Sequence, residues 1–105
     1  MMGISTHVLD TSKGRPAAGV KITLEFDHGG FDVVCHGKTN DDGRLRLIEQ
    51  PDRGTYRITF ETGEYFGGET FFPVATITFE VVDPAQHYHV PLLVSPYGYS
   101  TYRGS

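Results

Sequence analysis

Histidine and arginine side chains near both ends of this 105-residue chain have the chemistry needed to move protons. His7 lies in a short β-prone segment near the start, and His89 lies in an apolar segment near the end. Because imidazole titrates near neutral pH, one such side chain can act as a general base and another as a general acid. A nearby guanidinium would lower the pKa of a histidine and stabilise a developing oxyanion. Arg44 and Arg103 are the candidates for that guanidinium.

Alternation within the segment 87–95 places His89 on the outer face of a strand. The even-numbered residues are the core side: Tyr88, Val90, Leu92 and Val94. His89 then shares the outer face with Pro91 and Leu93. His7 likewise shares a face of its own segment with Leu9. Apolar side chains beside histidine on an outer face indicate an interface or a cleft.

From the residues alone, other uses of these side chains stay open. A lone surface histidine is commonly structural or solvated, and so is an arginine at a strand edge. His87 and His89 are separated by one residue and could hold a metal ion from one strand face, with His7 as a third ligand. The chain has no G-x-S-x-G, H-E-x-x-H or C-x-x-C motif and no phosphate-binding loop. Cys35, the only cysteine, lies in an apolar run and is expected to be a small buried hydrophobe.

The composition narrows the class of partner. A net charge of -4 and a pI near 5.6 argue against nucleic acid, because phosphate binding needs concentrated Lys and Arg. No apolar run approaches membrane-spanning length and no leader is visible, so a cytoplasmic protein without a membrane partner is expected. A single domain over residues 1–105 is expected, with oligomerisation as a supplement to a modest core.

Short alternating segments separated by turns must position the candidate residues. The clearest is 20–27, and seven more are expected at 4–10, 31–38, 44–48, 56–61, 75–82 and, joined at 96–98, twice within 87–105. The stretch 11–19 is expected to be a loop, and Asn40-Asp41-Asp42-Gly43 predicts a turn before Arg44. Residues 62–68 predict one or two helical turns with Thr62 as N-cap. These patterns are typical of an all-β sandwich.

The motifs that carry the candidate residues resemble those of the 5-hydroxyisourate hydrolases, the transthyretin-related enzymes of urate breakdown. The resemblance covers essentially the whole chain and rests on STHVLDT followed by GRPA, on TNDDGR, on HYHVPLLVSP and on YRGS. YRGS is the specific signal, because transthyretin itself, the hormone carrier of the same fold, lacks that ending. Transthyretin also lacks histidines that match His7 and His89.

This resemblance implies a transthyretin-like domain, an eight-stranded Greek-key β-sandwich with one short helix, assembled as a homotetramer that is a dimer of dimers. The implied catalytic residues are His7, Arg44 and His89, and the implied substrate-binding residues are Tyr102, Arg103, Gly104 and Ser105. The faces that bear His7 and His89 would meet across a central channel, with His87 at its mouth. No metal or cofactor is implied.

The implied reaction is hydrolysis of 5-hydroxyisourate to 2-oxo-4-hydroxy-4-carboxy-5-ureidoimidazoline. Water adds to a ring carbonyl and a cyclic amide C–N bond breaks. One of His7 and His89 would deprotonate the water and the other would handle the proton that goes to the leaving nitrogen, with their order left open. A non-enzymatic transthyretin-like carrier of a small aromatic ligand is the alternative, since the same sandwich and channel would serve it. A purely structural β-domain is a third possibility.

Overall fold

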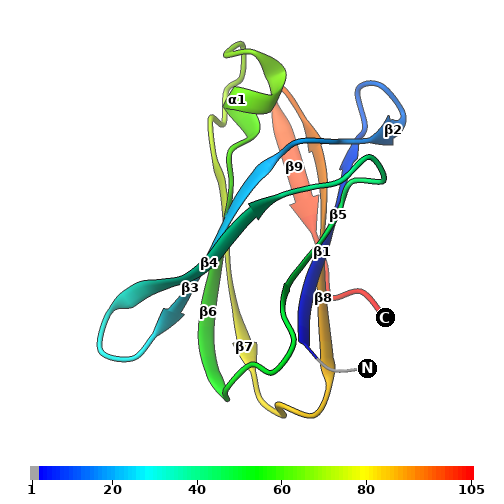
Figure 1. Cartoon of the computed structure of the whole chain (residues 1–105). Coiled ribbons are helices and arrows are strands. Elements are labelled where there is room, and N and C mark those ends of the chain that lie inside the picture. The colour runs from blue at the N-terminus through cyan, green and yellow to red at the C-terminus, as the bar shows by residue number, and fades with distance from the viewer. Residues whose placement is uncertain (1–2) are drawn as a thin grey trace.

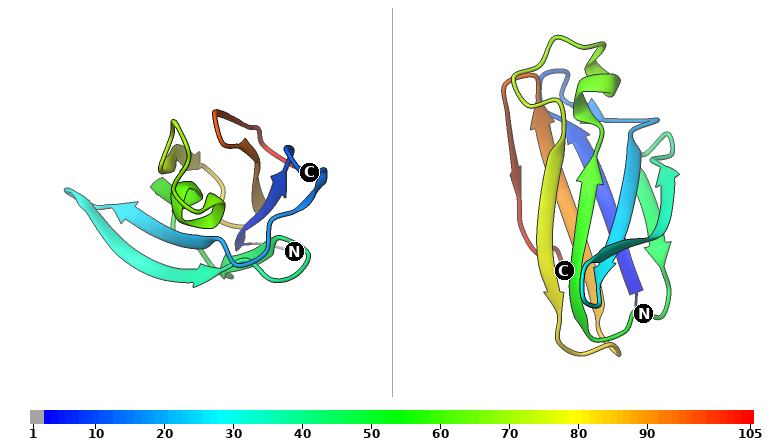
Figure 2. Two further views of the ribbon diagram at one scale, coloured as in Figure 1. Left: turned by 90° about the horizontal axis from the view of Figure 1, so that it is seen from above. Right: turned by 90° about the vertical axis from the view of Figure 1, so that its left-hand side faces the viewer.

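The computed structural model describes residues 3–105. It shows two β-sheets that pack face to face (Figure 1). One sheet has the strand order β2-β1-β8-β9, with β5 also paired to β1, and the other has the order β4-β3-β6-β7. The strands are β1 Gly3–Asp10, β2 Arg15–Pro16, β3 Lys21–Asp27, β4 Phe31–Lys38, β5 Arg44–Ile48, β6 Gly54–Phe60, β7 Ala75–Val81, β8 His87–Ser95 and β9 Gly98–Thr101. The predicted all-β sandwich is confirmed, and the view from above separates its two layers (Figure 2).

All eight predicted strands are present, but the stretch 11–19 is not purely a loop. Arg15 and Pro16 form the short strand β2, which pairs with Asp10 and Leu9 at the end of β1. A strand of two residues has no alternation that a sequence pattern could reveal, because only its pairing partner defines it. The predicted segments 31–38 and 44–48 match β4 and β5, and the bounds of most other strands differ by one or two residues. The last strand, which was expected to continue into the tail, ends at Thr101.

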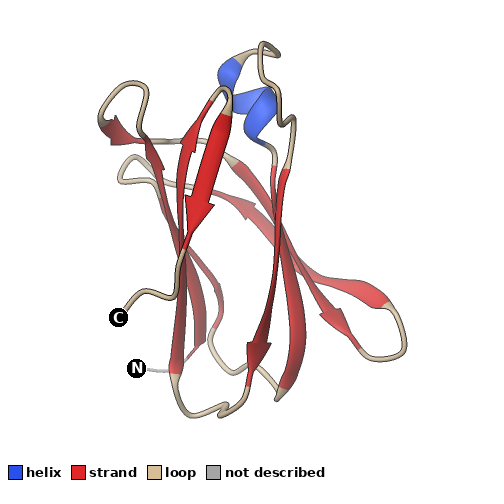
Figure 3. Ribbon diagram, turned by 180° about the vertical axis from the view of Figure 1, so that it is seen from behind, coloured by secondary structure: helices blue, strands red, loops and turns tan. Residues whose placement is uncertain are grey.

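Parallel pairing of β1 with β8 joins the two ends of the chain. The register runs from Gly3 opposite His87 to Asp10 opposite Val94. The other edge of β1 pairs antiparallel with β5. As a result β1 lies between β5, which carries Arg44, and β8, which carries His89. The start of β1 and the tail after β9 lie on the same side of the sandwich (Figure 3).

The core lies between the two sheets and is formed by alternate residues of their strands. Its largest fully buried apolar side chains are Phe60, Ile4, Ile22, Leu24, Ile58, Leu92, Val8, Val20 and Val81. Burial of each such side chain contributes roughly 1.5–3 kcal/mol relative to exposure. Tyr88, Val90, Leu92 and Val94 are all buried, so the inner face predicted for this strand is confirmed. The opposite face of β8 is thereby fixed as the outer surface of the sandwich.

A short helix, α1 (Thr62–Phe66), follows β6 and differs from the prediction in how it begins. Glu61 occupies the N-cap position and makes no side-chain capping bond, so the prediction that Thr62 is the N-cap is wrong. The Thr62 hydroxyl instead donates to the Phe72 carbonyl at 2.8 Å, because the returning chain offers a nearer acceptor. Gly67 ends the helix with φ 82°, a left-handed conformation that favours glycine. No helix within residues 3–105 is both long and apolar enough to span a membrane.

A buried carboxylate ties the end of β1 to α1. Asp10 is fully buried, and its Oδ2 accepts a hydrogen bond from the Tyr65 hydroxyl at 2.8 Å. Its Oδ1 accepts from the Ser12 hydroxyl and from the backbone N–H groups of Ser12 and Lys13. Burial alone would raise the pKa of Asp10, but these hydrogen bonds outweigh it and hold the pKa below its usual range. Burial and the bond to Asp10 raise the pKa of Tyr65 to about 12.

Candidate active site

The pairing of β1 with its two neighbours brings the candidate residues onto one sheet face. His7 on β1 lies opposite Arg44 on β5, and Ser5 on β1 lies opposite His89 on β8. Side chains two positions apart on a strand share a face, so Ser5 and His7 lie on the same side, as do His87 and His89. The register therefore places His7, Arg44 and His89 on three adjacent strands, and their catalytic role stays a prediction.

The turn before β5 is rigidly built and fixes the start of that strand. The Asn40 side-chain oxygen accepts hydrogen bonds from the N–H groups of Asp42 and Arg44, at 3.0 and 2.9 Å. Gly43 has φ 75°, and a Cβ placed there would lie 2.4 Å from the Val8 carbonyl oxygen. Only glycine allows this approach, in which the Val8 N–H donates to the Gly43 carbonyl at 2.7 Å. The turn thus clamps Arg44 against β1.

The same turn sets the protonation geometry of His7. Its Nε2 lies 2.9 Å from the Asp42 carbonyl oxygen, which can only accept a hydrogen bond. Nε2 therefore carries the proton, and in the neutral ring Nδ1 is the basic nitrogen. The half-buried ring is held at one nitrogen and retains the other for exchange of a proton.

His89 has the electrostatic environment of a neutral imidazole. Its Nδ1 lies 2.9 Å from the Ser5 hydroxyl oxygen. Burial lowers its pKa below the usual 6.5, and electrostatic interactions with His87, His7 and Arg44 lower it further. The ring therefore stays uncharged near neutral pH. When Nδ1 donates to the Ser5 hydroxyl, Nε2 is the nitrogen left to act as a base.

The tail, residues 102–105, packs against the His89 ring. The Gly104 N–H donates to the His89 carbonyl at 2.8 Å, which makes an isolated antiparallel bridge. A Cβ at Gly104 would lie 2.6 Å from Cδ2 of His89 and 3.3 Å from Cγ of Pro91. Glycine is thus required for this close approach. The tail also explains why Pro91 is buried although the alternation of β8 places it outward.

A shallow hollow of about 290 Å³ lies where these elements meet. Its lining comes from β1, β5, β8 and the tail and comprises Ser5, Thr6, Arg44, Arg46, His87, His89 and Ser105. Two guanidinium groups and two imidazoles surround a space open to solvent. Such a site can bind a polar, electron-rich ring and supply a neutral base beside positive charge. The sequence prediction did not include Ser5 or Arg46 and placed His87 only at the mouth of the channel, because the approach of these residues depends on the register of β1.

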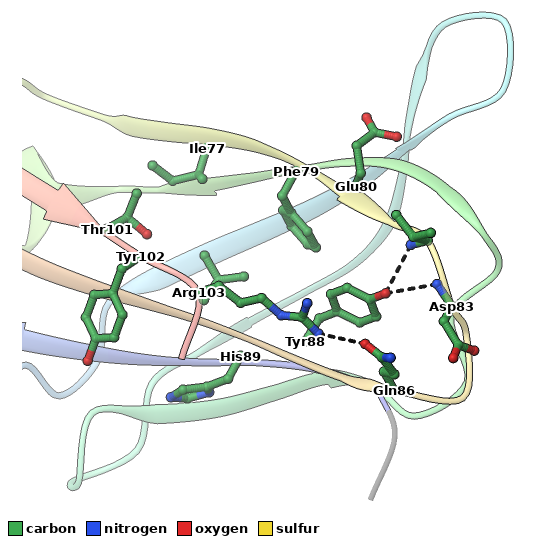
Figure 4. A pocket seen from close by; sticks show the side chains of 12 residues that line it. Ile77, Phe79, Glu80, Asp83, Gln86, Tyr88, His89, Thr101, Tyr102 and Arg103 are labelled. Carbon is green, nitrogen blue, oxygen red and sulfur yellow. Dashed lines mark hydrogen bonds between the residues drawn. The ribbon is translucent and has the colours of Figure 1, made fainter. Parts of the chain in front are cut away.

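The side chains of Tyr102 and Arg103 do not line this hollow, but they share another cavity with His89, which lines both. They line a second, more apolar cavity of about 410 Å³ at the open edge between the sheets, with Ile77, Phe79 and Tyr88 (Figure 4). The Arg103 guanidinium stacks over the Tyr88 ring, 4.4 Å from its centroid, and donates to the Gln86 side-chain oxygen at 3.1 Å. The tail thus sends Ser105 to the first hollow and Tyr102 and Arg103 to the second. Their predicted role in substrate binding stays a prediction.

The surroundings of Cys35 do not suit a nucleophile, and the described residues do not form a metal site. Cys35 is partly buried on β4, its thiol donates to the Leu47 carbonyl at 3.3 Å, and burial raises its pKa. A thiol with a raised pKa is a poor nucleophile. Within residues 3–105 no group of three or more His, Cys, Asp or Glu side chains is placed to hold a metal ion.

Comparison with known proteins places this geometry in a family. Residues 4–104 match the HIUase/Transthyretin family over nearly the whole chain. The chain belongs to that family. Among the curated relatives of this chain, the 5-hydroxyisourate hydrolase of Deinococcus radiodurans is 46% identical over 114 residues. The match covers 98% of this chain and 96% of the relative.

Solved structures of the family share the fold closely. The 5-hydroxyisourate hydrolase of Klebsiella pneumoniae is 39% identical, covers 100% of both chains and has a TM-score of 0.87. Transthyretin from Sparus aurata is 27% identical, with coverage of 99% and 97% and a TM-score of 0.92. An (S)-allantoin synthase is 39% identical with a TM-score of 0.87, but this chain spans only 43% of its length. Because the carrier matches the fold at least as well as the hydrolase, the fold does not separate the two activities.

Proposed function

We propose that this family member hydrolyses 5-hydroxyisourate to 2-oxo-4-hydroxy-4-carboxy-5-ureidoimidazoline. The observation that carries the proposal is His89, whose pKa is lowered and whose Nδ1 is held by Ser5, in one hollow with Arg44. A neutral imidazole beside a guanidinium suits activation of water, whereas a carrier of an aromatic ligand has no use for a poised base. Identities of 39–46% to proteins named as this hydrolase, against 27% and 32% to two transthyretins, support the same choice.

In the proposed mechanism His89 acts as the general base. Its Nε2 takes a proton from water, and the oxygen of that water adds to a ring carbonyl. Arg44 then stabilises the negative charge that develops on the carbonyl oxygen. The tetrahedral centre collapses, the cyclic amide C–N bond breaks and the leaving nitrogen gains a proton. His7, protonated at Nδ1 while Nε2 stays bonded to Asp42, lies on the same face to supply it.

We also propose that the site is completed by assembly into a homotetramer, a dimer of dimers. The hollow is open in the single chain, and its face also carries Leu9 and Leu93, which lie opposite each other on β1 and β8. A second copy laid over this face would exclude water and enclose the substrate between two sets of side chains. Sedimentation velocity at micromolar concentration tests this assembly. A monomer that retains full activity would contradict it.

The activity is tested by following the ultraviolet absorbance of freshly made 5-hydroxyisourate, which decays slowly without a catalyst. We expect the wild-type chain to accelerate the decay, and His89→Asn to remove most of the acceleration while the fold, seen by circular dichroism, stays intact. A folded wild-type chain that leaves the decay unchanged would refute the hydrolase. The second candidate, a carrier, rests on the TM-score of 0.89 to a transthyretin from sea bream in complex with thyroxine. Titration with an aromatic ligand such as thyroxine then separates the carrier from an inert β-domain.

A further inference from the structure

Ser5 lies between two imidazoles and contacts both. Its hydroxyl oxygen is 2.8 Å from Nε2 of His87 and 2.9 Å from Nδ1 of His89. The two rings come from the same face of β8, and their centroids are 6.0 Å apart. The three polar groups thus form a continuous chain that begins at the proposed base and ends at the first residue of β8.

A hydroxyl has one hydrogen to donate, which limits how the three groups can be protonated. Within residues 3–105 the Ser5 hydroxyl has no other hydrogen-bond partner, so it donates to one ring and accepts from the other, in one of two arrangements, or it accepts from both rings. In the first arrangement His89 Nδ1–H donates to Ser5, and Ser5 donates to His87 Nε2. This leaves Nε2 of His89 bare, as a base requires. In the second arrangement every hydrogen bond is reversed, and Nε2 of His89 carries a proton.

We infer that Ser5 and His87 form a proton relay behind His89 and carry the proton taken from water away from the catalytic ring. As His89 Nε2 gains a proton from water, its Nδ1 proton passes to Ser5 Oγ, and the Ser5 hydroxyl proton passes to His87 Nε2. Three protons move, and the positive charge ends on His87. Return along the same path re-protonates His89 at Nδ1 and releases the Nε2 proton. The inference rests on the hydrolase function proposed above, and Ser5 and His87 are positioning residues that act through His89.

The groups around the site oppose a positive charge that stays on His89. They come from each neighbouring element: His7 on β1, Arg44 and Arg46 on β5, His87 on β8, and Ser105 of the tail. His87, His7 and Arg44 all lower the pKa of His89. Transfer to His87 moves the charge along β8 to its first residue, which pairs with Gly3 and lies in the same hollow as Arg44 and Arg46. Arg103 donates to the backbone carbonyl of His87, at 3.4 Å, and not to its ring.

The decisive variant is His87→Gln, because glutamine can hydrogen-bond to Ser5 but cannot store a proton. We expect His87→Gln and Ser5→Ala each to lower kcat by about 100-fold, the lower end of what general acid–base catalysis contributes, with KM within about twofold. The double variant should be no slower than either single variant, because each single substitution already interrupts the same relay. Ser5→Thr keeps the hydroxyl and should recover most of the rate. His36→Gln on β4 and Ser100→Ala on β9 are the matched controls and should keep wild-type kcat.

Two further readouts separate a relay from a structural or purely electrostatic role. Rates are compared at about pH 8, where histidines of ordinary pKa are mostly neutral, so a return of the His89 pKa toward its ordinary value cannot by itself lower them. A proton inventory in mixed light and heavy water should be curved for the wild type and linear for His87→Gln. Nitrogen-15 NMR of the resting protein should show His89 protonated at Nδ1, and this preference should weaken in Ser5→Ala.

The outcomes are distinguishable from failure of the hydrolase itself. If the wild type does not accelerate the decay of 5-hydroxyisourate, the proposed function fails. If the wild type is active and folded His87→Gln keeps its kcat and its curved inventory, the relay fails and the hydrolase stands. NMR that shows His89 protonated at Nε2 at rest would also overturn the relay, without any activity measurement. Thermal melts of each variant confirm that a lost rate is not lost folding.

Discussion

His7 and Arg44 lie opposite each other on β1 and β5, and the turn that delivers Arg44 also holds the His7 ring. The Asp42 carbonyl accepts from Nε2 of His7, and Asn40 accepts from the backbone N–H of Arg44. A single turn therefore orients the acid proposed for the leaving nitrogen and the cation proposed for the oxyanion. The role of the Arg44 guanidinium can therefore be tested directly by substitution.

Replacing Arg44 with glutamine should lower kcat/KM by about 100- to 1,000-fold, the range found when a donor to a developing oxyanion is removed. Arg44→Lys keeps the charge but loses the planar fork and should recover only part of the activity. Arg53→Gln, an exposed arginine in the turn before β6, is the matched control and should behave as the wild type. Steady-state assays of 5-hydroxyisourate decay measure these effects. Full activity in Arg44→Gln would exclude the guanidinium from the mechanism.

The pH dependence of kcat/KM should report the lowered pKa of His89. A general base must be unprotonated, so activity should fall as pH drops, with an apparent pKa below the usual 6.5 of histidine. Because Arg44 is one cause of the lowered pKa, the residual activity of Arg44→Gln should fall at higher pH than that of the wild type. An acid limb above 6.5 in the wild type would contradict this assignment.

Gly104→Ala should separate the position of the tail from the stability of the fold. The added Cβ would meet the His89 ring, so either the tail or the ring must move. A displacement of about 1 Å in a catalytic group can cost on the order of 100-fold, and we expect a loss of kcat of that order. Gly98→Ala is the matched control, since its Cβ would meet nothing closer than Ser95 Oγ at 3.9 Å. If the two variants had equal activity, the contact between tail and ring would have no catalytic role.

Asp10→Asn should destabilise the protein at neutral pH by about 1–3 kcal/mol, because the buried site loses an acceptor for Ser12, Lys13 or Tyr65. The folded-state pKa of Asp10 lies below its usual 3.8. Its stabilisation is therefore present above the unfolded-state pKa and is lost as pH falls toward the folded-state pKa. Denaturant unfolding across the acid range should show a shallower pH dependence for Asp10→Asn than for the wild type. Exposed Asp41→Asn is the control, and an equal slope in both variants would refute the account.

The alternation of apolar residues was enough to predict the strands and their inner faces. The buried even-numbered residues of β8 were correctly predicted, and so was the outward direction of His89. The Asn-Asp-Asp-Gly turn was also predicted, because the hydrogen bonds from backbone N–H groups to Asn40 and the positive φ of Gly43 depend on residues close in sequence. Local features of this kind are encoded within a few residues, so the sequence reveals them directly.

The sequence by itself thus determined a β-sandwich, the faces of its strands and, through its motifs, a set of candidate residues near both chain ends. The tertiary structure decided which of these residues meet. Ser5 reaches His87 and His89 only because β1 pairs with β8 in one register. The Thr62 hydroxyl donates to the Phe72 carbonyl, and does not cap the helix, only because the chain returns past it. The same holds for Arg103, which stacks on Tyr88 rather than entering the hollow. Register and long-range approach depend on the packing of the whole core, which no short stretch of sequence contains.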